Sequence, residues 1–451
     1  MAEADGAFLI NERVKIMRDL ETVRKTALAA IEAAKDSIIE TGRWLWKNPE
    51  SGYREVKTSA YIVNELRKLG LEVKTDLAMT GFRADIDTGK PGPTVAIMGE
   101  MDSLLIPNHP ECDKTTGAVH SCGHNVGGPG LIGTAIAILA VKEDLCGKVV
   151  LIGTPAEEGI ELDYRKKLMA EGKIQAISGK SQLMLEGVLD DVDIAYMNHL
   201  SKGFGHRDHN GAINKRLTFH GVSCHAAGPQ NGRNALSAAT LAMDAIGLMR
   251  ESLGYSAYAR VHGIITHGGD AVNIIPNEVT MEYMLRMPKL DEMLKLNERF
   301  DKIVMDAAKA AECEVTIETV NGFLPLYDDV ELGHMVGDIV HYLQPDAAYD
   351  DNGNFAAGST DMGDVATVIP AVHGYVPGAG GQGHGIDYNI ADEYSAYVVN
   401  AQLEALTAIE LLYGDGAKGK AIAAHKANLM PMEEYKATVK KINQTIKSTD
   451  L

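Results

Sequence analysis

The spacing of apolar residues changes along the chain and predicts alternating helices and strands in its first part. Between residues 14 and 70, side chains such as Ile31, Ile38 and Leu45 recur at helical spacing and predict two helices. Short apolar runs then predict buried strands at 71–73, 94–98, 149–152 and 194–197, with an apolar helix at about 129–141. This alternation predicts an α/β fold, a doubly wound sheet with helices on both faces.

The pattern changes after residue 210. Strands are predicted at 216–220, 258–266, 278–286 and 314–319, and helices at 234–249 and 290–311. Their order is the β-α-β-β-α-β order of a ferredoxin-like unit, which is compact enough to be an inserted domain. We therefore expect a first part of the larger domain at 1–210, the inserted domain at 211–325, and the second part of the larger domain at 326–451. The last forty residues are rich in lysine and helical in pattern.

Composition limits the classes of function. The chain has 451 residues, which favours two domains over one, and a net charge of −19 from 62 acidic and 43 basic residues. This charge disfavours binding to nucleic acids and to anionic membrane surfaces. Five scattered cysteines do not form a disulfide framework, residues 1–13 lack the pattern of a signal peptide, and no apolar run approaches the ~20 residues of a membrane span. We expect a cytoplasmic protein.

Two short fragments contain metal-binding side chains. His120-Ser-Cys-Gly-His-Asn125 supplies a thiol and an imidazole, and Pro155-Ala-Glu-Glu-Gly159 supplies two carboxylates. In open α/β sheets, ligands bind beyond the carboxyl ends of the strands. Asp102, the glutamate pair and His199 each follow a different predicted strand. One such residue is more often a helix cap or a surface group, but three in a row beside Cys122-x-His124 favour a zinc-type metal site.

The neighbouring carboxylates of Glu157 and Glu158 predict two different roles. Consecutive side chains of an extended backbone point to opposite sides, so the two cannot easily bind one ion in the same way. One can bind the metal while the other accepts and returns the proton of a water molecule that the metal activates. A solvated acidic turn is the alternative, but Pro155 and Gly159 are typical of a fixed loop.

Several motifs, in order from about Trp44 to Asp392, resemble one known family. They are Gly99-Glu-Met-Asp-Ser-Leu104, Cys122-Gly-His-Asn125, Pro155-Ala-Glu-Glu158, Asn198-His199, His225-Ala-Ala-Gly-Pro229, Asn273-Ile-Ile-Pro276 and Gly383-His-Gly385. They are similar to the metal-dependent aminoacylase and exopeptidase family that includes hippurate hydrolase, auxin-conjugate amidohydrolases and succinyl-diaminopimelate desuccinylase. Gly358-Ser-Thr-Asp-Met-Gly-Asp364 most resembles the branch of aminobenzoyl-glutamate hydrolase and cytosolic dipeptidase. Asn125 departs from the aspartate of the hippurate and auxin branches and removes one negative charge.

The resemblance implies a role for each matching residue. The ligands of two divalent metal ions would be Cys122, His124, Glu158, His199 and His384. Zinc or manganese is expected, with cobalt or nickel as alternatives. Glu157 would be the general base and acid, and Asp102 would orient a ligand. The inserted domain would form a homodimer, from which His225 would stabilise the oxyanion in the partner's site while Asn273 and Arg286 hold the substrate.

The resemblance implies hydrolysis of an amide in an N-acyl amino acid, an amino-acid conjugate or a dipeptide. Two alternatives stay open. A metal-containing dimer could bind a small ligand without catalysis, although a binder needs no proton-transferring glutamate. A nicotinamide oxidoreductase could use the run Gly128-Pro-Gly-Leu-Ile-Gly133, although no buried strand precedes these glycines, which instead fit close packing at a helix start.

Overall fold

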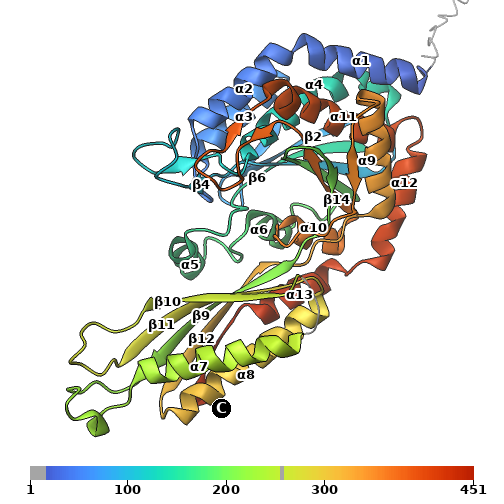
Figure 1. Ribbon diagram of the computed structural model, residues 1–451. Coiled ribbons are helices and arrows are strands. Elements are labelled where there is room, and N and C mark those ends of the chain that lie inside the picture. Colours follow the sequence, from blue (N-terminus) through green and yellow to red (C-terminus); the bar gives the residue numbers. More distant parts are fainter. Residues whose placement is uncertain (1–16, 254–257, 451) are drawn as a thin grey trace, which may run out of the picture.

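The computed structural model describes residues 17–253 and 258–450 as a larger domain above an elongated smaller one (Figure 1). Residues 1–13, which lack a signal-peptide pattern, lie outside the described ranges. The helices are α1 (Leu20–Ala33), α2 (Lys35–Lys47), α3 (Val56–Lys68), α4 (Gly127–Val141), α5 (Leu162–Ala170), α6 (Gly179–Leu185), α7 (Ala235–Met249), α8 (Leu290–Ala310), α9 (Val330–Leu343), α10 (Met362–Val368), α11 (Asn400–Leu412), α12 (Ala417–Ala423) and α13 (Met432–Ile442).

The strands form two main sheets and two short pairs. Their bounds are β1 (Val73–Leu77), β2 (Gly81–Asp87), β3 (Thr94–Glu100), β4 (Leu104–Leu105), β5 (Ala118–Val119), β6 (Lys148–Thr154), β7 (Ile194–Leu200), β8 (Phe204–His206), β9 (Gly211–His220), β10 (Arg260–His267), β11 (Glu278–Met287), β12 (Glu314–Phe323), β13 (Tyr349–Asp351), β14 (Ala371–Val376), β15 (Ala379–Gly380), β16 (Asn389–Ile390) and β17 (Gln444–Lys447).

The sheet of the larger domain has eight strands in the order β1-β2-β6-β3-β7-β14-β8-β13. Its central strands β6, β3, β7 and β14 are parallel, so their carboxyl ends meet at one edge. Helices α1 to α4 and α11 cover one face, and α6 and α10 lie against the other (Figure 1). The predicted doubly wound α/β fold is confirmed.

Close packing explains the glycine-rich start of α4. A Cβ atom at Gly127 would lie 2.5 Å from the Glu100 carbonyl oxygen, and one at Gly133 would lie 2.4 Å from Ala401 Cβ.

By length and composition, the stretch His124–Asp144 could span a membrane, and no other described stretch could. The expectation that no apolar segment reaches this length is therefore wrong, but 83% of the most apolar window of this stretch is buried inside the protein.

The smaller domain has the predicted β-α-β-β-α-β order, β9-α7-β10-β11-α8-β12. Its antiparallel sheet has the order β10-β11-β9-β12-β17, with α7 and α8 packed on one face. The strand β17 was not expected, because the last forty residues predicted helices alone; it pairs with β12 through Ile446 and Ile317. The N-terminal region also differs, since three helices replace the predicted two and the chain turns at Ala34.

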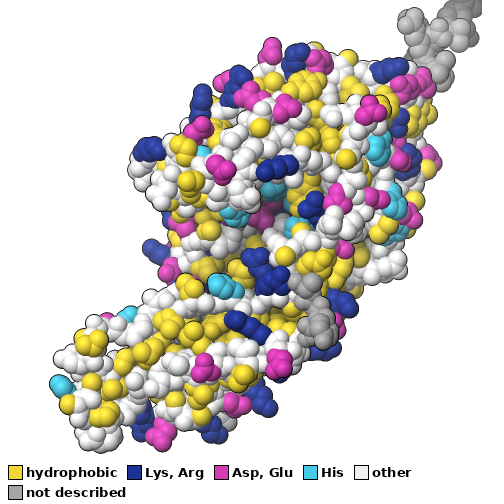
Figure 2. All heavy atoms as spheres, viewed as in Figure 1, with side chains coloured by type: hydrophobic (Ala, Val, Ile, Leu, Met, Phe, Trp, Pro, Cys, Tyr) yellow, Lys and Arg dark blue, Asp and Glu magenta, His cyan; other side chains and the backbone are white. Residues whose placement is uncertain are grey.

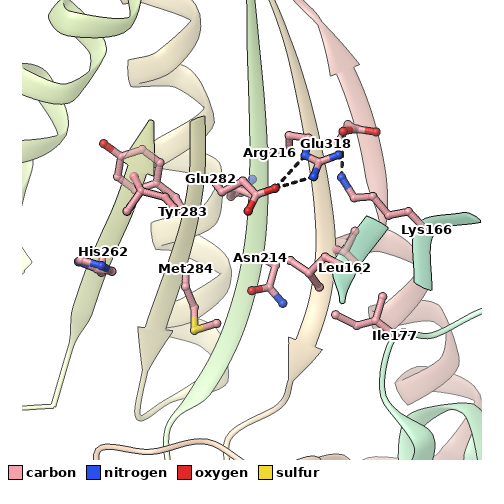
Figure 3. Close-up of a pocket in the computed structure, with 14 residues that line it drawn as sticks. Leu162, Lys166, Ile177, Asn214, Arg216, His262, Glu282, Tyr283, Met284 and Glu318 are labelled. Atoms are coloured by element: carbon pink, nitrogen blue, oxygen red, sulfur yellow. Dashed lines mark hydrogen bonds and ion pairs between the residues drawn. The ribbon is translucent and has the colours of Figure 1, made fainter. Parts of the chain in front are cut away.

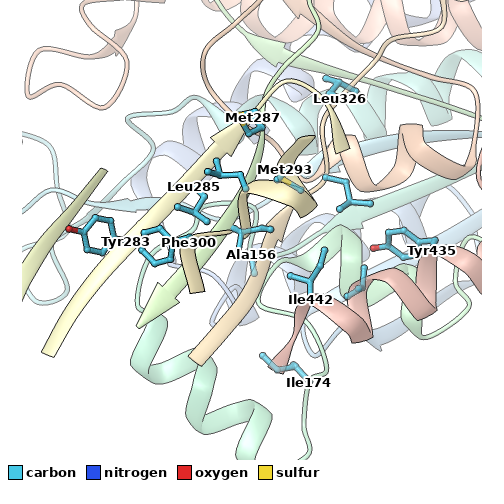
Figure 4. Close-up of a cluster of buried hydrophobic side chains, with 14 of the residues drawn as sticks. Ala156, Ile174, Tyr283, Leu285, Met287, Met293, Phe300, Leu326, Tyr435 and Ile442 are labelled. Atoms are coloured by element: carbon cyan, nitrogen blue, oxygen red, sulfur yellow. The ribbon is translucent and has the colours of Figure 1, made fainter. Parts of the chain in front are cut away.

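Buried apolar side chains connect the two domains. One hydrophobic cluster includes Phe300 and Leu285 of the smaller domain, Leu326 at the junction, and Tyr435 and Ile442 of α13 (Figure 4). The helix α13 therefore packs where the domains meet, which fixes the base of the smaller domain beside the larger one.

Candidate metal centre

The metal-binding candidates gather where the parallel strands of the larger sheet end. Asp102 follows β3, the glutamate pair follows β6, and His199 lies next to the last residue of β7. Cys122 and His124 come from the loop before α4, and His384 comes from the loop between β15 and β16. Histidine and acidic side chains lie together in a hollow of the larger domain that opens toward the smaller one (Figure 2).

Cys122 lies at the centre of the cluster. Its Sγ atom is 3.3 Å from His199 Nε2 and 3.3 Å from His384 Nε2. Glu158 Oε1 is 3.6 Å from His384 Nε2. Candidate ligand atoms within 4.8 Å of one another form the sets Cys122–His124–His199, Cys122–Glu158–His384 and His124–Glu157–Glu158. The structure therefore brings together all five side chains that the sequence predicted as ligands, with Glu157 beside them.

Asp102 contacts two residues of the cluster, His124 and Glu158. Its Oδ1 atom lies 3.0 Å from His124 Nδ1, and its Oδ2 atom accepts the backbone N–H of Glu158 at 2.9 Å. Because Asp102 and His124 are both buried, this contact fixes the orientation of the imidazole and leaves Nε2 facing the cluster. Asp102 therefore contacts His124, one of the ligands that the resemblance implied.

The residues of the cluster fit a metal ion by their donor chemistry. Thiol, imidazole and carboxylate groups are the ligands of zinc-type sites. His124 Nε2 and Glu158 Oε1 are buried without a well-aligned hydrogen-bond partner, a condition that costs about 1–3 kcal/mol for each group. A cation would satisfy both atoms, so these two buried atoms point to the same use as the donor set.

Burial shifts the proton affinities of the cluster. Burial, followed by the neighbouring charges of Glu100, Glu158 and Asp361, raises the pKa of Glu157 well above its usual value. Burial also raises the pKa of the Cys122 thiol and lowers the pKa of His199 to about 4. The histidine is therefore neutral and able to bind a metal, whereas the thiol must lose a proton to do so.

The two glutamates share His124 as a neighbour and differ in their other contacts. Glu158 faces Cys122 and His384, while the Glu157 carboxylate lies within 4.8 Å of those of Glu100 and Asp361. Ala156, just before the pair, has a φ of 53°, which is unusual for a residue with a side chain. Its backbone N–H donates to buried Glu55 at 2.8 Å, which holds this strained turn in place.

Three buried residues near Glu157 were missed by sequence reasoning. Lys180 Nζ donates to Glu100 Oε1 at 2.6 Å and to Asp361 Oδ1 at 2.5 Å. Glu100 Oε2 lies 3.2 Å from His124 Nε2, so this carboxylate joins the lysine to the metal-binding cluster. Glu100 and Asp361 belong to motifs that carry the resemblance, but nothing in the sequence pattern shows that Lys180 would be buried between them.

The remaining predicted residues lie on the smaller domain. His225 and Asn273 are exposed on two neighbouring loops, which are joined by a backbone hydrogen bond from Ala226 N to the Asn273 carbonyl oxygen at 3.0 Å. Arg286 is half-buried near the end of β11, where its Nη1 atom is 3.4 Å from the Ala357 carbonyl oxygen. Across the described ranges, no hydrogen bond or ion pair joins His225 to the five candidate ligands of its own chain.

A separate pocket of about 260 Å³ lies between α5 of the larger domain and the face of the smaller sheet opposite α7 and α8 (Figure 3). Leu162 and Ile177 line it from the larger domain, and Met284 and Ile264 line it from the sheet. The pocket does not include the metal-binding cluster, although the chain segments that line it flank Glu158 and Lys180.

Comparison with known proteins identifies relatives of the chain. Residues 207–312 match the model of a peptidase dimerisation domain of the M20 type. The Xaa-Arg dipeptidase of Mus musculus is 27% identical over 381 residues, which cover 79% of this chain and 80% of that protein. One component of the p-aminobenzoyl-glutamate hydrolase from Escherichia coli (strain K12) is 29% identical over 300 residues, covering 63% and 58% of the two chains.

Solved structures share the fold. The YXEP protein of Bacillus subtilis, described as a dinuclear metal-binding peptidase of the M20 family, superposes with a TM-score of 0.66 at 20% identity, covering 84% of this chain and 99% of that one. The aminobenzoyl-glutamate utilization protein of Klebsiella pneumoniae gives a TM-score of 0.62 at 20% identity, covering 84% and 97%. These comparisons confirm the resemblance that the motifs indicated: the chain is similar in sequence to curated dipeptidases and amino-acid hydrolases, and it shares the fold of an M20 peptidase.

Proposed function

We propose that the chain is a metal-dependent hydrolase that cleaves an amide bond in an N-acyl amino acid, an amino-acid conjugate or a dipeptide. The observation that carries the proposal is the convergence of four other potential ligands on Cys122, with the carboxylate of Glu157 beside them. Relatives named as dipeptidase and amino-acid hydrolase support this class of substrate.

The five side chains Cys122, His124, Glu158, His199 and His384 would hold two divalent ions. Such ions, when bound, polarise a carbonyl group and acidify water. The thiol ligand favours zinc, with manganese, cobalt and nickel as alternatives. Asp102 would keep His124 in the tautomer whose Nε2 atom is free to bind.

Glu157 would take the proton of the attacking water and deliver it to the leaving amine. Proton transfer by a positioned side chain contributes typically 10²–10⁴-fold to the rate. Burial and three neighbouring carboxylates raise the pKa of Glu157, so its acid form is accessible between the two transfers.

The smaller domain would complete the site in a homodimer. His225 is exposed and away from the cluster of its own chain, and residues 207–312 match a dimerisation domain, which supports a contribution of His225 to the oxyanion site of the partner. Asn273 and Arg286 would hold the carboxylate or carbonyl of the substrate. All five cysteines are unpaired, which supports a reducing compartment such as the cytoplasm.

The proposal is tested with the metal-loaded protein and a panel of N-acyl amino acids and dipeptides. Glu157→Gln should keep its metal content and lose about 10²–10⁴-fold in kcat. His199→Ala should lose metal, and the surface variant Glu171→Gln should match the wild type. Near-normal turnover by Glu157→Gln would show that its role is wrong. An inert wild type that binds one panel member tightly would indicate a non-catalytic binder.

A further inference from the structure

The pocket between α5 and the smaller sheet has apolar side chains in its lining, together with charged side chains that are paired in salt bridges. Leu162, Ile177, Ile264, Met284 and Val320 supply apolar surface. At about 260 Å³ it is smaller than the roughly 300–1,000 Å³ pockets that enclose drug-sized ligands. Its size therefore suits one side chain or a group of similar size.

The charged residues around the pocket form ion pairs with one another. Arg216 Nη2 lies 2.6 Å from Glu282 and 2.5 Å from Asp163, and Lys166 Nζ lies 2.9 Å from Glu318 (Figure 3). Each of these cations is therefore already paired with a carboxylate. Besides these ion pairs and the apolar surface, the lining has the amide of Asn214, the imidazole of His262, the ring of Tyr283 and Lys215, whose ammonium group is paired with Asp301.

Arg286 supplies an unpaired cation directly beside the pocket. Met284 and Arg286 are two residues apart on β11, so their side chains lie on the same face of the sheet, and Arg286 Nε is 3.1 Å from Met284 Sδ. Within the described residues, no carboxylate lies within ion-pair distance of Arg286, and burial alone lowers its pKa. The apolar pocket thus adjoins a guanidinium group that no described carboxylate pairs.

The pocket is also close to the metal-binding cluster along the chain. Leu162 follows Glu158 by four residues, and Ile177 precedes Lys180 by three. At no more than about 3.6 Å per residue, these separations cannot exceed about 14 Å and 11 Å between Cα atoms. Two residues that line the pocket therefore lie within these distances of Glu158 and Lys180.

We propose that the pocket binds the side chain of the amino acid released by the reaction and selects apolar side chains, while Arg286 binds the carboxylate of the same amino acid. This inference rests on the proposed hydrolase function and adds the preferred substrate class: amides whose carboxyl-terminal residue is leucine-like or phenylalanine-like. A bidentate pair between arginine and a carboxylate would orient the residue so that its side chain enters the neighbouring pocket.

The test compares kcat/KM for the N-acetyl and N-benzoyl derivatives of glycine, leucine and phenylalanine, with the metal-loaded enzyme. The wild type should prefer the better of the two apolar residues over glycine by at least about tenfold, as expected for a side chain buried in an apolar pocket. Met284→Trp fills the pocket and should lower this ratio at least tenfold. Leu162→Ala, which removes a wall contributed by the other domain, should lower it as well. Val330→Trp, at an exposed position outside the pocket, should leave the ratio and the activity unchanged.

The outcomes separate this inference from the proposed function. An active wild type with no preference for apolar residues would overturn the pocket's role and leave the hydrolase intact. The same holds if a folded Met284→Trp and Leu162→Ala both keep the wild-type ratio. If Met284→Trp fails to fold, as judged by circular dichroism, the Leu162→Ala ratio alone decides. A metal-loaded wild type that cleaves none of the six amides but cleaves dipeptides of the panel would overturn the pocket's role alone, and one that cleaves neither would overturn both proposals.

Discussion

The ammonium nitrogen of Lys180 lies 2.6 Å from Glu100 Oε1, and both side chains are buried. Asp361 holds the same lysine from the other side and also accepts the backbone N–H of Lys180 at 2.9 Å. Glu100 in turn lies beside His124, and its carboxylate is near that of Glu157. The lysine therefore places a fixed positive charge among carboxylates that would otherwise repel one another.

Removal of this lysine should destabilise the protein and slow the reaction. Breaking a buried ion pair by removing one partner costs about 3–5 kcal/mol, because the remaining charge stays buried without compensation. We expect Lys180→Met to lower the free energy of unfolding by about this amount, measured in urea, whereas Lys436→Met, in an ion pair with exposed Glu433, should cost less than about 1 kcal/mol.

A double variant separates stability from positioning. Lys180→Met with Asp361→Asn removes one charge of each sign and should recover part of the lost stability. It should not recover kcat, because Glu100 still lacks the group that orients it. Recovery of both stability and kcat would show that the lysine only balances charge.

Metal uptake should release protons. Burial raises the pKa of the Cys122 thiol, so the thiol is protonated at neutral pH when no cation is bound. A metal that binds the thiolate must displace this proton, and the apparent affinity should therefore fall as the pH falls. An indicator dye in weakly buffered solution should report proton release when zinc is added to chelator-treated protein. Cys122→Ser should release less, and equal release by the two proteins would contradict a thiolate ligand.

Mixed dimers should show whether His225 acts on the partner chain. Glu157→Gln and His225→Ala should each be nearly inactive. In a heterodimer of the two, one site combines an intact Glu157 with a partner's intact His225, so random exchange of chains should restore about a quarter of wild-type activity. The sample is prepared by separating the protomers of the two variants and reassembling them together. If activity does not recover although the exchange of chains has been verified, His225 acts in the site of its own chain.

The dimer interface should include α7 and the edge strand β10. On α7, Leu248 is 75% exposed, Leu241 is 42% exposed and Met243 is 38% exposed, so this helix presents several apolar side chains that a partner chain would cover. Leu248→Glu should therefore shift the protein from dimer to monomer in light scattering coupled to size exclusion. Val330→Glu, at another exposed apolar position, is the matched control and should leave the mass unchanged.

Stability should depend on pH through His425, which packs near the start of α9. Its Nδ1 atom lies 2.7 Å from Asp329, and this hydrogen bond raises the pKa of His425 above 6.5. The contribution of the pair is therefore fully present below pH 6.5 and is lost as the pH rises through the folded-state pKa. Relative to His425→Gln, the wild type should gain more stability at pH 6 than at pH 9, by less than about 1 kcal/mol because the ring is partly exposed. An equal difference at both pH values would contradict this account.

The sequence predicted more of the metal-binding cluster than of the pocket and the residues that would bind the substrate. Cys122 and His124 share one loop, and Glu158 and His199 each follow an apolar strand, so the rule for carboxyl ends of parallel strands places them together. His384 could be identified only from the motif that contains it, because its loop follows no predicted strand. The position of β17 was missed because four residues at the edge of a sheet have too short a pattern to indicate their partner strand.

Apolar periodicity and local motifs thus determined the fold class, the inserted domain and the identity of the candidate ligands, because these depend on residues close in sequence. Tertiary structure decided what depends on contacts between distant segments: the burial of Lys180 between Glu100 and Asp361, and the pocket that α5 forms with the face of β11. From sequence alone, a lysine is expected at the surface. Only the folded chain brings two carboxylates to the ammonium group of Lys180 and buries all three groups away from water.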